Sequence, residues 1–69
     1  MTLVEAKDIR VGDILFHKEY KNADGTPQRW KVTSVKNWKR NPLRIQIGLK
    51  RGMYQFEKID ESYLDEFFV

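Results

Sequence analysis

The chain contains no cysteine, and this absence excludes several kinds of chemistry at once. There is no disulfide, no thiolate nucleophile and no sulfur ligand for a metal. Small secreted domains usually depend on disulfides, so the sequence predicts an intracellular, cytoplasmic protein. A single histidine, His17, is too little for a zinc site, and neither a Walker loop nor a dinucleotide fingerprint is present. We therefore expect no metal and no cofactor.

Long apolar runs are missing as well. Glu5, Lys7 and Asp8 interrupt the N-terminal segment, which is therefore not a signal peptide, and no stretch approaches the length of a membrane span. The 69 residues suffice for one domain with a small core. Apolar residues make up 41% of the chain, enough to fold, so disorder is not expected. The expectation is a single domain over residues 1–69 that contacts no membrane.

Acidic residues are absent from the whole middle of the chain. Residues 25–56 hold eight Lys or Arg, both tryptophans and no Asp or Glu, whereas residues 57–69 hold five acids and one Lys. The modest net charge of +3 therefore hides a strongly basic centre. A cationic stretch that contains aromatics is typical of surfaces that bind polyanions. A run of charge is also what a small domain uses to stay soluble, and that alternative stays open.

Residues 29–36 alternate in the first half of the segment. Trp30 and Val32 fall on one side, while Arg29, Lys31 and Thr33 fall on the other. β-Branched residues are frequent here, as in strands. We expect an amphipathic strand with Trp30 in the core and a cationic outer face.

Residues 43–50 show the cleanest alternation in the sequence. One side carries the apolar positions Leu43, Ile45, Ile47 and Leu49, which predicts that these four form the core. The other side carries Arg44, Gln46, Gly48 and Lys50. A half-buried strand with a second cationic outer face follows from this pattern.

Turn-forming residues separate these segments. Gly12, Asp24-Gly25 and Arg51-Gly52 mark bends or turns, and Asn41-Pro42 predicts that residues 36–42 form a basic loop. The last ten residues begin with a capping Asp60 and predict one helical turn before a terminal strand. The predicted fold is all-β: a small closed or half-closed barrel of about five antiparallel strands with a short helical turn before the last strand.

In the order of its elements the chain resembles the SH3-like barrels. The resemblance rests on the tripeptide Val11-Gly12-Asp13, a long first loop, three meander strands, a one-turn helix and a closing strand. It is also loosely similar to KOW-type barrels of transcription and ribosome-associated proteins, through Asp24-Gly25 followed by Val32. The aromatic residues with which signalling SH3 domains bind proline-rich peptides are missing. The resemblance implies a small barrel without that activity.

Catalysis is not expected. His17 lies two residues from Glu19, a spacing that permits an acid-base pair, but no nucleophile elbow accompanies it. A lone histidine at a strand end is more often a surface or rim residue, and we predict that role for His17. We therefore expect a protein that is not an enzyme.

The basic middle is the candidate binding site. The first hypothesis is nucleic-acid binding, to DNA or RNA, through backbone contacts and with Trp38 stacking on a base. Alternatively, Trp38 folds back over an open barrel end, and the residues alone do not decide between the two. The candidate site residues are Arg29, Lys31, Lys36, Trp38, Lys39, Arg40, Arg44, Lys50 and Arg51.

The second hypothesis is a protein-interaction module. The same basic face would dock on an acidic surface of a larger enzyme, with Trp38 as the buried anchor. A free-standing chain of this size is similar in type to the small accessory proteins that bacteriophages make to bind and redirect host machinery. We expect a monomer, or a weak homodimer formed through a sheet edge near Phe67, Phe68 and Val69.

Overall fold

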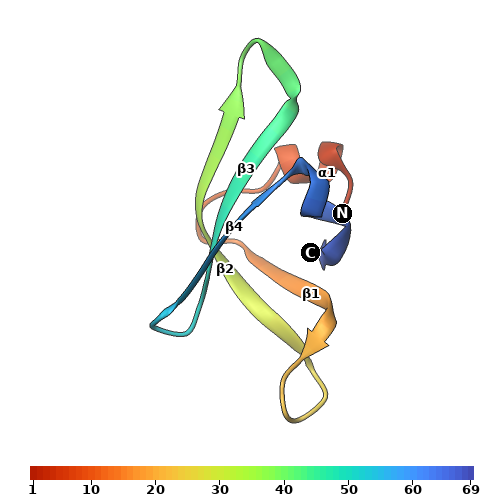
Figure 1. The fold of residues 1–69 in the computed structure, drawn as a ribbon, viewed down its shortest axis with the longest axis vertical. Coiled ribbons are helices and arrows are strands. Elements are labelled where there is room, and N and C mark those ends of the chain that lie inside the picture. The colour runs from red at the N-terminus through yellow and green to blue at the C-terminus, as the bar shows by residue number, and fades with distance from the viewer.

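The computed structural model describes residues 1–69, and one antiparallel sheet dominates it (Figure 1). The strand order is β4-β3-β2-β1-β5, so the predicted all-β character with five strands is confirmed. The edge strands β4 and β5 do not pair with each other, and the sheet is therefore open: the barrel is not closed. The elements are α1 (Leu3–Lys7), β1 (Ile14–Lys21), β2 (Pro27–Trp38), β3 (Asn41–Arg51), β4 (Gln55–Asp60), the 3-10 helix η1 (Glu61–Glu66) and β5 (Phe67–Phe68).

The core lies on one face of the sheet, and α1 and η1 close it from that side (Figure 1). Trp30 and Val32 point inward as predicted, and Trp30 is only 4% exposed. Ile45, Ile47 and Leu49 are buried with them, which confirms three of the four core positions predicted in β3. The helical turn before the last strand is also confirmed, with Asp60 as the N-cap of η1.

The short helix α1 was not predicted. Thr2 and Glu5 form a capping box: the Thr2 side chain accepts from the Glu5 N–H, and the Glu5 carboxylate accepts from the Thr2 N–H. The Thr2 backbone N–H, and then the Thr2 side chain, lower the pKa of Glu5 by hydrogen bonding to its carboxylate. The Met1 amino group donates to the carbonyls of Leu64 and Phe67 at 2.8 and 2.7 Å, which ties the start of the chain to η1 and β5.

A β-bulge in β2 changes which residues face outward. Val32 pairs with Leu49 and Ser34 pairs with Gly48, so Thr33 is the extra residue. Gly48 is buried under the bulge, and a Cβ placed there would overlap Ser34 Oγ. A larger residue fits here only if the Ser34 and Thr33 side chains move. Because the bulge shifts the alternation by one residue, Val35 returns to the core side and the next residue along β2 faces outward.

The predicted loop over residues 36–42 is wrong. β2 continues to Trp38, Lys39-Arg40 form the turn, and β3 begins at Asn41. The strand can include Pro42 because no third strand flanks this part of the hairpin, so the missing N–H leaves no partner unsatisfied. Residues Lys36–Arg44 form a projecting tip, here called the arm, which extends past α1 (Figure 1).

Leu43 does not belong to the core, and its prediction is also wrong. It is 71% exposed, although the alternation places it on the same side as Ile45. The physical reason is the length of the hairpin. Helix α1 reaches the arm only at Asn37, whose Oδ1 accepts from Lys7 Nζ, and Leu43 lies beyond this contact with nothing to pack against.

Candidate functional site

Trp38 lies on the arm next to two cations, Lys36 of its own strand and Arg44 of the neighbouring strand. The Arg44 guanidinium carbon is 4.3 Å from the centroid of the Trp38 ring, and Lys36 Nζ is 4.9 Å from it. Both distances are within the range of cation–π attraction. Trp38 is half-buried by these contacts and does not fold back over the barrel opening, since it lies at the far end of the hairpin. The structure therefore brings Lys36, Trp38 and Arg44 together as one cluster.

The end of the arm is cationic as well. Lys39 and Arg40 form the turn, and both side chains are exposed. No acidic residue lies between Lys36 and Arg44. Five of the predicted site residues are thus collected on the arm: Lys36, Trp38, Lys39, Arg40 and Arg44.

A second group of predicted site residues lies on the outward face of the central sheet. Lys31 in β2 pairs directly with Lys50 in β3, and Arg29 lies two residues before Lys31. Like charges at directly opposed positions repel each other. Lys50 Nζ lies 5.7 Å from the ring centroid of Phe56, its partner in β4. This group carries positive charge without a neutralising neighbour.

Arg51 is separate from both groups. Its Nη1 donates to Gln55 Oε1 at 2.9 Å, and its Nη2 donates to Asn22 Oδ1 at 3.0 Å. The guanidinium therefore links the β3–β4 turn to the β1–β2 turn. Of the predicted site residues, Arg51 is the one whose donors the fold itself uses.

Positive and negative side chains of the chain do not pair. The only ion pair within 4.0 Å joins His17 Nε2 to Glu66 Oε2, and no Lys or Arg contacts a carboxylate at that distance. None of the 13 Lys or Arg side chains of the chain therefore has a carboxylate within ion-pair distance. The cations of the arm are consequently available to an external anion.

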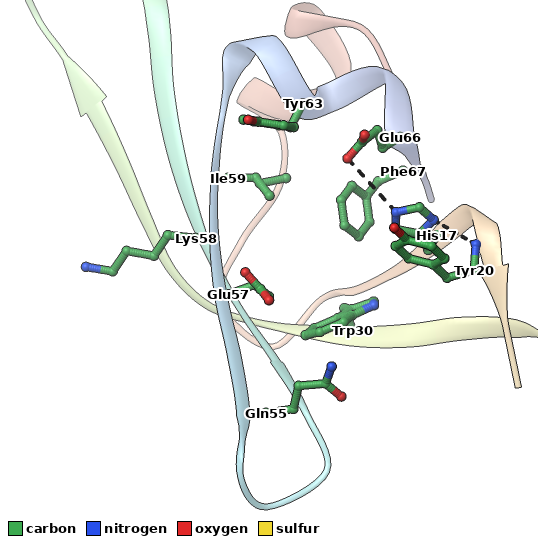
Figure 2. A pocket seen from close by; sticks show the side chains of 10 residues that line it. All are labelled: His17, Tyr20, Trp30, Gln55, Glu57, Lys58, Ile59, Tyr63, Glu66 and Phe67. Carbon is green, nitrogen blue, oxygen red and sulfur yellow. Dashed lines mark hydrogen bonds and ion pairs between the residues drawn. The ribbon is translucent and has the colours of Figure 1, made fainter.

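Acidic and aromatic side chains gather around a cavity of about 380 Å³ on the opposite side of the sheet. We call it the open-side pocket, because it lies where β4 stands apart from β1 and β5. Figure 2 shows the carboxylates of Glu57 and Glu66 on the pocket side, whereas the Lys58 side chain extends away from it. The lining residues are His17, Tyr20, Trp30, Gln55, Glu57, Lys58, Ile59, Tyr63, Glu66 and Phe67.

His17 lines this pocket, and the prediction of a surface or rim residue is wrong. It is 5% exposed, and its Nδ1 accepts from the backbone N–H groups of Glu19 and Tyr20, both at 3.0 Å. Its ring stacks on Tyr20 at 4.4 Å and meets the edge of Phe67 at 4.9 Å. The carboxylate nearest to its Nε2 belongs to Glu66, not to Glu19. His17 organises the end of β1 against η1 and β5.

Trp30 contributes an unsatisfied donor to the same region. Its indole Nε1 is buried and has no hydrogen-bond acceptor in the protein. A buried N–H without an acceptor costs free energy, so such a group is informative where it adjoins a cavity. Trp30 is therefore both a core residue and a wall of the open-side pocket.

Sequence reasoning missed the open-side pocket. Its residues are spread from His17 to Phe67, and only the strand order brings them together. The one signal available was the acid-rich segment 57–66, which supplies both inward carboxylates. No three His, Asp or Glu side chains converge as metal ligands would, and neither helix has the length and apolar character needed to cross a membrane.

No known protein family, curated protein or solved structure matches this chain.

Proposed function

We propose that the protein is a non-enzymatic nucleic-acid-binding domain that contacts DNA or RNA through the arm. The observation that carries the proposal is the cluster of Lys36, Trp38 and Arg44, with its cations unpaired and its aromatic ring at the end of a projecting hairpin. A base that stacks on Trp38 places its phosphate next to two cations. Stacking of this kind contributes about 1–3 kcal/mol per base.

The outward face of the sheet extends this surface. Lys31, Lys50 and Arg29 continue the positive charge from the arm toward the β1–β2 end of the sheet. Their mutual repulsion is relieved when a phosphate lies between them. Most contacts would be to the backbone, so sequence readout is expected to be slight. The basic face belongs to one open antiparallel sheet, in which η1 joins the edge strands β4 and β5.

The test is fluorescence anisotropy with labelled single-stranded DNA, single-stranded RNA and duplex DNA across a salt series. The proposal expects affinity to fall linearly with salt on logarithmic axes, by a slope of about −0.7 to −0.9 per phosphate contact. Charge reversal by R44E or K39E should abolish measurable binding at physiological salt. No binding to any of the three probes at low salt would sink the proposal.

The matched control is K21E. Lys21 is exposed at the end of β1, outside the arm, and K21E changes the net charge by the same amount as K39E. Binding through the arm predicts that K21E retains most of the affinity. If K21E and K39E weaken binding equally, the interaction depends on net charge and not on the arm.

Leu43 favours a second candidate function, docking of the arm on an acidic protein surface. A leucine that is 71% exposed beside Arg44 offers apolar contact area, which a protein interface uses and a phosphate backbone does not. The variant L43A separates the two: it should weaken a protein complex and leave nucleic-acid affinity unchanged. A pull-down from nuclease-treated bacterial lysate, compared between L43A and the unchanged protein, measures the first effect. Anisotropy measures the second.

A further inference from the structure

The open-side pocket lies on the other side of the sheet from the basic face and plays no part in the proposed function. Its cavity of about 380 Å³ falls within the size range of ligand sites. The carboxylates that reach it belong to Glu57 and Glu66, and no ammonium or guanidinium points into it (Figure 2). Its charge therefore disfavours an anion and favours a cation.

The walls of the pocket narrow the choice of cation. Tyr20, Tyr63 and Trp30 present aromatic groups around the cavity, and the stacked ring of His17 adjoins Tyr20. Aromatic groups attract cations, and a planar guanidinium can both stack on a ring and donate in parallel to a carboxylate. An arginine side chain matches this combination of two acids and several aromatic groups.

The indole N–H of Trp30 adds a second requirement. Nε1 is buried without an acceptor, and a guanidinium has only donors. The ligand must therefore bring an acceptor of its own, such as the carbonyl of a peptide unit. β4 is an edge strand beside the cavity, so its free backbone groups can pair with an extended segment.

From these observations we infer that the open-side pocket binds an arginine residue of a polypeptide. The guanidinium lies between Glu57 and Glu66, and a carbonyl of the bound segment accepts from Trp30 Nε1. The site is independent of the arm, so both surfaces can be occupied at once.

The test follows the two indole N–H signals of the ¹⁵N-labelled protein by NMR, with W38F used to assign the Trp30 signal. The probe is N-acetyl-arginine-N-methylamide, which offers a guanidinium and two peptide carbonyls. We expect the Trp30 signal to shift with a dissociation constant on the order of 1 mM, as suits so small a ligand. The citrulline analogue, which has the same shape without the charge, should cause no shift.

Variants locate the site within the pocket. E57Q and E66Q should each weaken the arginine probe about tenfold, since each removes one charged acceptor. E61Q is the control, because Glu61 lies on η1 but does not line the pocket, and it should bind as the unchanged protein does. The remaining amide signals of the same spectra report whether each variant is folded.

Three outcomes would overturn the inference: no shift of the Trp30 signal at the highest soluble probe concentration, an equal shift with the citrulline analogue, or equal weakening by E61Q and E57Q. Free arginine is titrated in parallel to identify the source of the ligand. Tighter binding of the diamide supports a polypeptide segment. Tighter binding of free arginine contradicts the polypeptide part of the inference.

Discussion

The arm and the open-side pocket lie on different parts of the same sheet and carry opposite charge. The arm projects, and its charged side chains, such as Lys39 and Arg40, are all cationic. The pocket is hollow, and the charges that point into it, on Glu57 and Glu66, are negative. No Lys or Arg pairs with a carboxylate anywhere in the chain. Without internal ion pairs, the cationic arm is complementary to an anionic partner and the acidic pocket to a cationic one.

The two tryptophans differ in the same way, one buried in the core and one on the arm. Replacing them should give the largest changes in stability and in nucleic-acid affinity. W30A removes a buried side chain and should lower the free energy of unfolding by about 3–5 kcal/mol. A 69-residue domain has roughly 3–10 kcal/mol in total, so the variant should be partly unfolded at 25 °C. W38A should cost less than about 1 kcal/mol of stability. Urea denaturation followed by circular dichroism measures both.

For nucleic-acid affinity the order is reversed: replacement of Trp38 should have the larger effect. W38A should lose about 5- to 150-fold, the equivalent of one stacked base. W30F keeps an aromatic ring in the core and should retain the affinity. If W38A were as destabilised as W30A, Trp38 would be a core residue and the assignment of the arm as a binding surface would fail.

Gly48 should give the next largest effect, because it sets which side chains of the hairpin face outward. In G48A the new Cβ would collide with Ser34 Oγ, and relief of such overpacking costs about 1–3 kcal/mol. The double variant S34A/G48A removes the nearest atom and should recover part of the loss. Urea denaturation of the two variants tests this. Equal stability of G48A and the unchanged protein would show that the bulge does not need glycine.

A pair of charge-neutralising variants compares the two surfaces directly. K39Q/R40Q should weaken DNA or RNA binding and reduce the magnitude of the salt slope by about 1.4–1.8. E57Q/E66Q should change the affinity by less than about twofold, since charges farther away than the Debye length of about 8 Å are screened at physiological salt. Anisotropy across salt measures both. A larger change from E57Q/E66Q would mean that the nucleic acid reaches the pocket.

Local alternation in the sequence was sufficient to predict much of the sheet. Trp30, Val32, Ile45, Ile47 and Leu49 were placed in the core correctly, because a strand that is buried on one face repeats every second residue. The turns fared as well where glycine was required: Gly12 and Gly25 both have positive φ. These features depend on residues that are close in sequence.

The extent of the β2–β3 hairpin, the first helix and the burial of His17 were not predicted correctly. Leu43 continues the alternation but lies beyond the reach of the helices. Asn41-Pro42 would end a strand that is flanked on both sides, but here only β2 pairs with this part of β3. Helix α1 does have a local signal in the sequence, the capping box from Thr2 to Glu5. The burial of His17 had no local signal, since Glu66 and Phe67 approach it only in the folded sheet.

Acid should weaken the fold slightly, through carboxylates that accept hydrogen bonds in turns and caps. The Ser62 hydroxyl, and then the Ser62 N–H, lower the pKa of Asp60, and Arg44 of the arm lowers it further. The hydroxyl of Thr26 acts in the same way on Asp24. A pKa lowered in the folded state means that these contributions are present above the ordinary value of 3.8 and are lost as pH falls through the folded value.

The smallest predicted effect comes from the charge interaction between Arg44 of the arm and Asp60, the N-cap of η1. D60N keeps a capping oxygen but removes the charge, so the loss of stability between pH 5 and pH 2, roughly the range in which Asp titrates, should be smaller than in the unchanged protein. D65N, at a position without a side-chain hydrogen bond, is the control and should keep the full pH dependence. Thermal unfolding at each pH is the measurement.

R44Q should reduce the same pH dependence in part, because Arg44 lowers the pKa of Asp60 only after the two Ser62 hydrogen bonds. If R44Q leaves the pH dependence of stability unchanged, the charge of Arg44 does not act on Asp60, and the arm contributes no electrostatic stability to the rest of the domain.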